Sequence, residues 1–122
     1  MMAARVPDGW HSITPRLVVQ DTSKLVEFLR DAFGALGEFQ SDRPSVLRIG
    51  DSNVMVSGVG PREAMRSFLY LYVEDIDDTY RRALSAGAVS LEEPKDLPYG
   101  DRRAMVEDPT GNIWQIATPR IQ

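Results

Sequence analysis

Two stretches of similar sequence, ITPRLVVQD at residues 13–21 and SFLYLYVED at residues 67–75, set the plan of this 122-residue chain. Each is rich in the aliphatic, β-branched and aromatic residues that favour strands, and each ends in an aspartate that can begin a helix. Aligning LVVQD with LYVED superimposes Asp21 on Asp75, an offset of 54 residues. This repeat predicts two copies of one supersecondary unit.

A segment with helical periodicity follows each of these strands. Asp21 or Thr22 can cap the first helix at its start, and Gly34 is a suitable stop. Gly87 ends the second segment in the same way. The apolar positions at helical spacing are Leu25, Phe28, Leu29, Ala32 and Phe33 in the first segment, and Ile76, Tyr80 and Ala83 or Leu84 in the second.

Short strands complete each unit. SVLRIG and NVMVSG are joined at Gly50-Asp51-Ser52, which is a hairpin signal, and residues 38–40 are a candidate for one more strand. DRRAMVED and GNIWQIAT form a second hairpin across Pro109-Thr110-Gly111. We therefore predict an α+β fold of two βαβββ modules, at about residues 12–58 and 67–119 of a single domain spanning 1–122. The two modules form a curved, cup-shaped mixed sheet with helices on the outside.

The amino-acid composition argues against several classes of protein. A hydrophobic content of 43% suits one compact core, and the net charge of −4 with no basic run argues against a nucleic-acid partner. The absence of cysteine excludes disulfides and thiolate chemistry. No stretch has the length of a membrane span, and the N-terminus lacks the apolar core of a signal peptide. These features predict a cytoplasmic protein with no membrane partner.

The motifs together resemble those of a known family. LVVQD running into a helix that ends in AFGA, LRIGDS, LYVEDIDD, YGDR and DPTGNIWQIAT are similar to the vicinal oxygen chelate superfamily. That superfamily includes glyoxalase I, bleomycin-resistance proteins, fosfomycin-resistance enzymes and extradiol dioxygenases. The resemblance extends from about Ser12 to Pro119, and it implies the fold more specifically than any one activity.

The resemblance also implies where a metal would lie. Catalytic members of the superfamily hold a divalent cation with four inward side chains, usually His and Glu. The matching positions of this chain are occupied by Thr14, Val46, Phe68 and Gln115. Two neutral oxygens and two hydrocarbon side chains do not form a site for a hard divalent cation. We therefore expect no metal, no other cofactor and no catalytic residue of the family's usual kind.

The expected cup instead presents aromatic and polar groups. Strand alternation places Thr14, Arg16 and Val18 on one inner surface, and Phe68, Tyr70 and Tyr72 on another. The last strand contributes Ile113, Gln115 and Ala117. Trp114 points the opposite way, between sheet and helix. The predicted ligand-binding residues are Thr14, Arg16, Met55, Phe68, Tyr70, Tyr72, Tyr99 and Gln115, with Tyr99 at the mouth of the cup.

Ordinary packing or solvation is the competing interpretation for several residues. The aromatic row suits sheet packing, and the single histidine, His11, lies ahead of the first strand without an obvious partner. Asp101 and Arg102 can form a surface ion pair of little energetic value. The acidic residues in predicted loops or edges, most of them interpreted as solvated charges, are Glu38, Glu63, Glu92, Glu93 and Asp101.

Three functional interpretations follow. The first is a metal-free protein that binds a small aromatic or amphipathic molecule, such as an antibiotic, as bleomycin-resistance proteins do. By the same resemblance, this interpretation implies a homodimer with the ligand between subunits. The second is a lyase or isomerase of the glyoxalase family with a non-standard active site. The third is a module that binds a partner and uses the fold as a scaffold.

Overall fold

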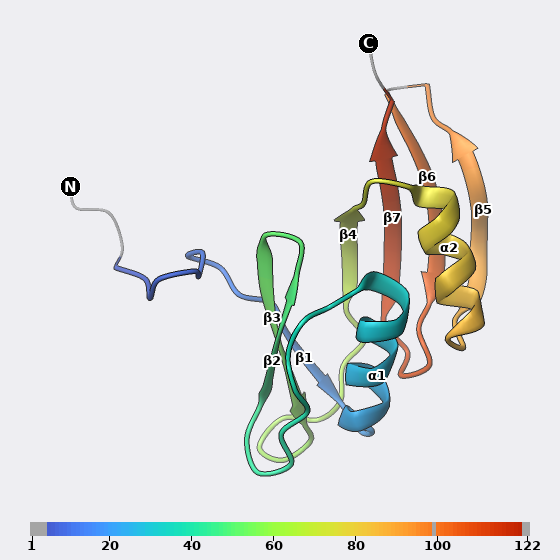
Figure 1. Ribbon diagram of the computed structural model, residues 1–122. Coiled ribbons are helices and arrows are strands. Elements are labelled where there is room, and N and C mark those ends of the chain that lie inside the picture. Colours follow the sequence, from blue (N-terminus) through green and yellow to red (C-terminus); the bar gives the residue numbers. More distant parts are fainter. Residues whose placement is uncertain (1–4, 99, 121–122) are drawn as a thin grey trace.

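In the computed structural model, which describes residues 5–98 and 100–120, the strands form two mixed sheets (Figure 1). The first sheet has the order β1-β3-β2, and the second has the order β4-β7-β6-β5. β1 runs parallel to β3, and β4 runs parallel to β7. The other neighbouring strands are antiparallel. The strands are β1 (Arg16–Val19), β2 (Ser45–Ile49), β3 (Ser52–Gly58), β4 (Phe68–Tyr72), β5 (Val89–Asp96), β6 (Asp101–Glu107) and β7 (Ile113–Pro119). The predicted α+β class is confirmed.

The two helices begin at the predicted aspartates. α1 (Thr22–Phe33) is capped by Asp21, whose side chain accepts a hydrogen bond from the Lys24 amide at 3.1 Å. α2 (Ile76–Ser85) is capped in the same way by Asp75, which accepts from the Asp78 amide at 3.1 Å. These side chains satisfy amide groups that have no partner within the helix.

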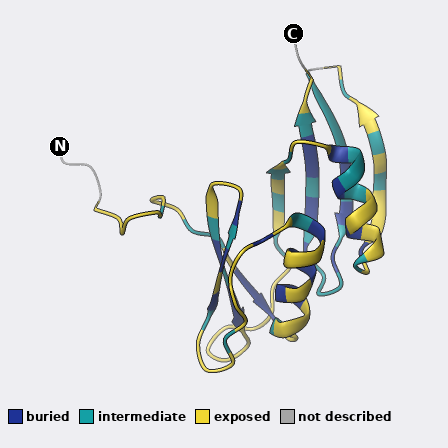
Figure 2. Cartoon of the chain, viewed as in Figure 1, coloured by how far each residue is buried: buried dark blue, intermediate teal, exposed yellow. Residues whose placement is uncertain are grey.

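Each helix packs on one side of its own sheet, and the buried residues gather between helix and sheet (Figure 2). Within α2 it is Ala83, fully buried, that faces the core, whereas Leu84 is exposed. The fully buried side chains of this layer include Leu17, Leu25, Phe28, Leu29, Leu47, Val56, Val106 and Ile116. The opposite side of each sheet, away from the helices, is called the inner face below.

The two modules meet through their helices. α1 packs against α2, and Phe33 at the end of α1 reaches across to the second sheet. Its ring lies edge-on to Phe28 at 5.4 Å and to Trp114 at 4.9 Å, centroid to centroid. The aromatic contact of Phe33 with Trp114 therefore links the core of one module to the core of the other.

The DPTGN turn is held by a buried carboxylate. Asp108 Oδ1 accepts hydrogen bonds from the Thr110 amide at 2.8 Å, the Thr110 hydroxyl at 2.8 Å and the Asn112 amide at 3.1 Å. Asp108 Oδ2 accepts from the Trp114 indole nitrogen at 2.8 Å. Trp114 thus lies on the helix side of the sheet, as alternation predicted. The turn motif has a structural role in this fold.

Two strands differ from expectation. The candidate strand at residues 38–40 is irregular, and its neighbour Leu36 forms an isolated bridge with Arg48 instead. The first sheet therefore has three strands, while the second has the full four. β5, by contrast, contains Glu92, which the sequence placed in a loop or edge. This edge strand was not predicted from the sequence, because it contains Pro94 and pairs irregularly with β6.

Candidate functional site

The inner face of the second sheet brings several predicted residues together. Cross-strand pairing places Phe68 beside Ile113, Tyr70 beside Gln115, and Tyr72 beside Ala117. Gln115 in turn pairs with Met105 on β6, and Ala117 pairs with Arg103. Alternation along each strand therefore places Phe68, Tyr70, Tyr72 and Gln115 on one surface, as predicted.

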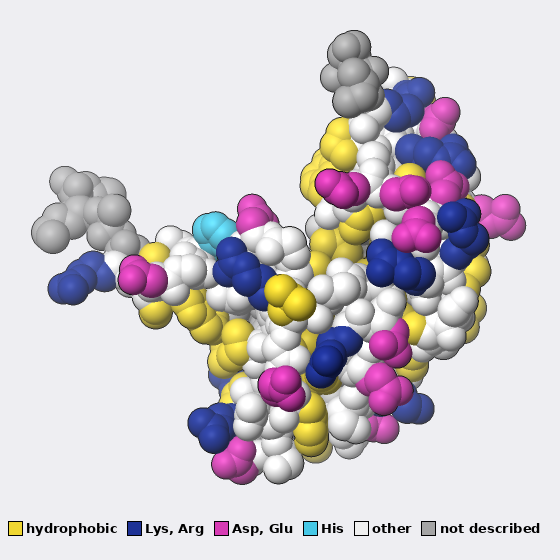
Figure 3. All heavy atoms as spheres, in the orientation of Figure 1, with side chains coloured by type: hydrophobic (Ala, Val, Ile, Leu, Met, Phe, Trp, Pro, Cys, Tyr) yellow, Lys and Arg dark blue, Asp and Glu magenta, His cyan; other side chains and the backbone are white. Residues whose placement is uncertain are grey.

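This surface is unusually rich in exposed aromatic side chains. Phe68 is 66% exposed, Tyr72 59% and Tyr70 41%. All three lie on β4, the edge strand of the sheet. Figure 3 shows the molecule hollowed between the β2–β3 hairpin and β4, with hydrophobic side chains on the β4 side of the hollow. Three aromatic side chains in a row on an open edge are typical of a surface that another molecule covers.

Asp101 organises the two tyrosines. The Tyr70 hydroxyl donates to Asp101 Oδ2 at 2.7 Å, and the Tyr72 hydroxyl donates to the same oxygen at 3.1 Å. The two rings lie 5.3 Å apart with their planes tilted by 54°. Both hydroxyls reach β6 across β7, where the small Ala117 is fully buried. The carboxylate thus fixes the orientation of both phenols.

Burial and the hydrogen bond to Asp101 raise the pKa of Tyr70 to about 12. The hydrogen bond from Tyr72 to the same carboxylate raises the pKa of Tyr72. Both phenols are protonated near neutral pH, so they act there as hydrogen-bond donors. A tyrosine with this pKa is a poor general base, because base catalysis is most efficient with a pKa near the operating pH.

The Tyr70 pKa predicts a loss of stability in alkali. The unfolded chain releases this proton near pKa 10.0 and the folded chain near 12, so the stabilisation is complete below pH 10 and disappears between pH 10 and 12. We expect the unfolding free energy to fall less between pH 9 and 11 in Tyr70→Phe than in the unmodified protein. Urea unfolding at the two pH values measures this difference, and an equal fall in both proteins would contradict it.

The predicted residues of the first module lie on a separate surface. Arg16 pairs with Met55 across β1 and β3, and its Nε donates to Ser57 Oγ at 2.8 Å. Val46 lies on the other side of Met55, and Thr14 is half-buried ahead of β1. Arg16 lines two cavities formed by residues 16–62 of its own module. Tyr70 lines a different cavity, between the β2–β3 hairpin and β4, so within one chain Arg16 and Tyr70 contribute to different cavities.

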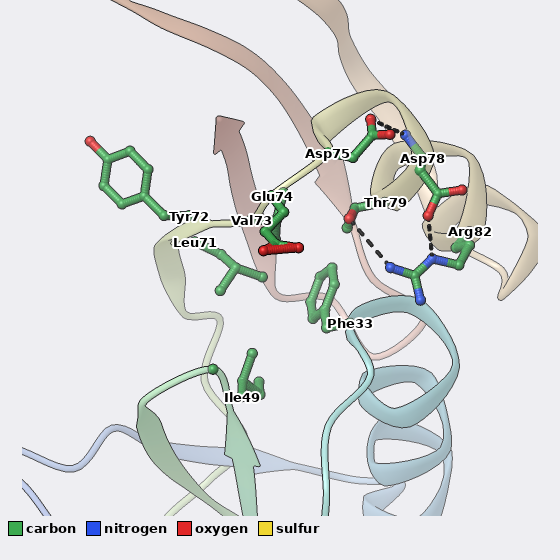
Figure 4. Close-up of a pocket in the computed structure, with 11 residues that line it drawn as sticks. Phe33, Ile49, Leu71, Tyr72, Val73, Glu74, Asp75, Asp78, Thr79 and Arg82 are labelled. Atoms are coloured by element: carbon green, nitrogen blue, oxygen red, sulfur yellow. Dashed lines mark hydrogen bonds and ion pairs between the residues drawn. The ribbon is translucent and has the colours of Figure 1, made fainter. Parts of the chain in front are cut away.

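A groove of about 480 Å³ lies at the junction of the modules (Figure 4). Phe33, Ile49 and Leu71 point toward one another on its apolar side, while the Tyr72 ring points away from it. Asp78 on its polar side forms an ion pair with Arg82 at 3.2 Å. Asp78 and Arg82 thus pair with each other within the helix, and the groove is a feature of the junction rather than of the inner face.

The four positions matched to the family's metal ligands do not suit a cation. Val46 and Phe68 carry no donor atom, and Thr14 and Gln115 offer neutral oxygens. Among residues 5–98 and 100–120, no group of three or more His, Cys, Asp or Glu side chains is arranged to hold a metal ion. The donor set of the family's metal site is thus missing from these positions.

Other sequence-based assignments have mixed outcomes. Tyr99 lies outside the described residues. His11 is exposed ahead of β1. The proposed pairing of Asp101 with Arg102 is wrong, because Arg102 points to the helix side and binds Asp77 at 3.0 Å and Asp96 at 3.1 Å.

Two acidic residues interpreted as solvated are partly buried and have partners. Glu92 binds Arg103 at 3.2 Å and Lys95 at 3.4 Å. Asp101 binds the two tyrosines and is the residue of the aromatic surface that sequence reasoning missed. The alternation of DRRAMVE carried the signal, since it places Asp101 on the same face as Arg103 and Met105. None of the helices in the described part of the chain is long and apolar enough to span a membrane.

The fold is that of a known class of proteins. Residues 10–116 match the model of the Glyoxalase/Bleomycin resistance protein/Dioxygenase superfamily, so the chain belongs to this superfamily. An uncharacterised protein of Mycobacterium tuberculosis is 29% identical over 126 residues, covering 88% of this chain and 74% of that protein.

Solved structures show the same fold. TioX from Micromonospora sp. ML1 superimposes with a TM-score of 0.78 at 24% identity, covering 88% of this chain and 97% of TioX. The fosfomycin resistance protein FosX from Mesorhizobium loti superimposes with a TM-score of 0.69 at 21% identity, covering 91% of this chain and 93% of FosX. The predicted family is confirmed.

Proposed function

We propose that this protein binds a small aromatic or amphipathic molecule without a metal ion, using Phe68, Tyr70, Tyr72 and Gln115 on the inner face of the second sheet. The observation that carries the proposal is the row of three exposed aromatic side chains beside the Gln115 amide, with Phe68 and Gln115 standing at two of the positions matched to the family's metal ligands. Aromatic rings supply stacking surface, and Gln115 and the phenols supply directed hydrogen bonds.

A homodimer with a pocket between the subunits is part of this proposal. In one chain, Arg16 and Met55 lie on a different surface from Tyr70 and Gln115. A second copy related by twofold symmetry can place the first module of one chain against the second module of the other. Members of the superfamily often form dimers, and the exposed β4 edge supports such an assembly. We further propose that the dimer acts in the cytoplasm.

Ligand binding is tested by calorimetric titration and thermal shift with a panel of aromatic and glycopeptide antibiotics, the first class to examine given the named functions of the relatives. We expect at least one compound to bind and to raise the melting temperature, because a ligand that binds the folded state stabilises it. For that compound, Phe68→Ala should weaken binding by about tenfold, the loss of one stacked aromatic contact. Phe39→Ala, which removes another exposed phenylalanine on the irregular segment after α1, is the matched control.

The molar mass of each variant is measured by light scattering, so that lost binding is separated from lost assembly. A metal would contradict the proposal: elemental analysis that finds about one Ni, Zn, Mn or Fe per chain, removed by a chelator together with thermal stability, argues for the enzyme interpretation instead. Chemical turnover of a bound compound would likewise favour a lyase or isomerase.

A further inference from the structure

The Asp101 carboxylate has spare capacity to bind a ligand. Both phenol hydroxyls donate to one of its oxygens, Oδ2. Its other oxygen, Oδ1, accepts no hydrogen bond from any described residue. A carboxylate has about four lone-pair sites, so Asp101 can accept further hydrogen bonds from a ligand without losing the tyrosines.

Asp101 is also unneutralised within this face. Arg103, its neighbour on β6, binds Glu92 at 3.2 Å, and Arg66 at the rim binds Glu107 at 3.3 Å. Arg102, the residue next to Asp101, is turned to the helix side and held by Asp77. Across residues 5–98 and 100–120, no lysine or arginine lies within ion-pair distance of Asp101. The negative charge of the Asp101 carboxylate is therefore available to a ligand.

Aromatic rings flank the carboxylate. The Tyr70 and Tyr72 hydroxyls point at the carboxylate, and their rings, 5.3 Å apart and in residues 41% and 59% exposed, leave apolar surface open to a ligand beside it. The face of an aromatic ring attracts a cation, and aromatic side chains combined in this way recognise substituted ammonium groups. A carboxylate beside two fixed rings provides both attractions at one place.

We propose that the ligand carries a positively charged nitrogen, which binds Asp101 Oδ1 against the rings of Tyr70 and Tyr72. This inference rests on the proposed function and assigns the class of its ligand: an aromatic organic cation rather than a neutral or anionic molecule. An anionic ligand would meet the unneutralised carboxylate at the centre of the aromatic surface. The raised pKa of both tyrosines supports the assignment, because their hydroxyls continue to donate to Asp101 and hold it in place.

The test uses two probes of the same shape and different charge. Thioflavin T is a flat aromatic cation, and 2-(4-dimethylaminophenyl)-6-methylbenzothiazole is the neutral molecule that lacks only its ring N-methyl group. Calorimetric titration of the full chain should give a dissociation constant about tenfold lower for the cation, through its attraction to the carboxylate and the rings. Asp101→Asn should reduce this preference to near unity. Asp31→Asn, which removes the same charge from an exposed position on α1, should leave the preference unchanged.

A further variant distinguishes the effect of the Asp101 charge from that of the Tyr72 hydroxyl. Tyr72→Phe keeps the ring and removes its hydroxyl, so the preference for the cation should persist. Thermal melting of each variant confirms that it folds. Equal affinities of the unmodified protein for the two probes would overturn the inference while the antibiotic panel still decides the proposed function. Failure of both probes to bind, or an equal loss of preference in Asp31→Asn and Asp101→Asn, would also overturn it.

Discussion

Replacing Asp108 with alanine is expected to lower the free energy of unfolding by about 3–5 kcal/mol. The change removes the acceptor of four hydrogen bonds in a turn where Asp108 is 3% exposed. The Trp114 indole N–H and the Asn112 amide would be left buried without a partner. Each such unsatisfied group costs about 1–3 kcal/mol.

Chemical denaturation measures this loss. Asp108→Asn should lie between the two proteins, because it keeps one acceptor oxygen but turns an amide donor toward an amide or the indole. Glu107→Gln is the matched control, since its ion pair with Arg66 is on the surface and worth little. A loss below about 1 kcal/mol for Asp108→Ala would show that water or local rearrangement replaces the network.

Gly37→Ala is expected to destabilise the first module by about 2–4 kcal/mol. Gly37 has a φ of +136°, and an added Cβ would lie 2.5 Å from the carbonyl oxygen of Val46 and 2.8 Å from a Leu47 methyl group. The clash is with strand backbone, which cannot move aside without breaking the neighbouring bridge. That bridge comprises the Leu36 amide to the Arg48 carbonyl at 2.9 Å and the reverse bond at 2.8 Å.

Gly34→Ala is a useful comparison for this prediction. Gly34 also has a positive φ, of +68°, but nothing lies within 4 Å of an added Cβ. Its cost should therefore be limited to the left-handed backbone, about 1–2 kcal/mol. Urea unfolding of the two variants separates steric exclusion from conformational strain, and equal losses would show that the contact with Val46 contributes nothing.

Helix-capping residues and the alternation of side chains along strands made most of the fold predictable from the sequence. Asp21, Asp75 and Gly34 mark helix ends through their own hydrogen bonds and dihedral angles. Alternation from Phe68 to Tyr72 determines which side chains share a face, whatever the tertiary context. The β5 strand was harder to predict because its charged residues and Pro94 suit an edge, where solvent takes the place of a neighbouring strand.

The site was less predictable because it depends on contacts between distant segments. Tyr70 and Asp101 are 31 residues apart, and only the pairing of β4, β7 and β6 brings them together. The separation of Arg16 from Tyr70 likewise depends on how the modules pack, which the repeat does not specify. Strand parity identified the aromatic row, but the carboxylate that organises it required the three-dimensional arrangement.

The buried turn around Asp108 joins β6 to β7 and binds Trp114 on the helix side of the second sheet, whereas the aromatic row lies on the inner face of β4. The side chains that hold this turn are therefore separate from those that we propose contact a ligand. Exposed positions of the inner face such as Phe68 can therefore be substituted with less effect on folding than Asp108. Such a division allows ligand specificity to change through single substitutions on the inner face, whereas DPTGN contributes to stability and says nothing about which ligand is bound.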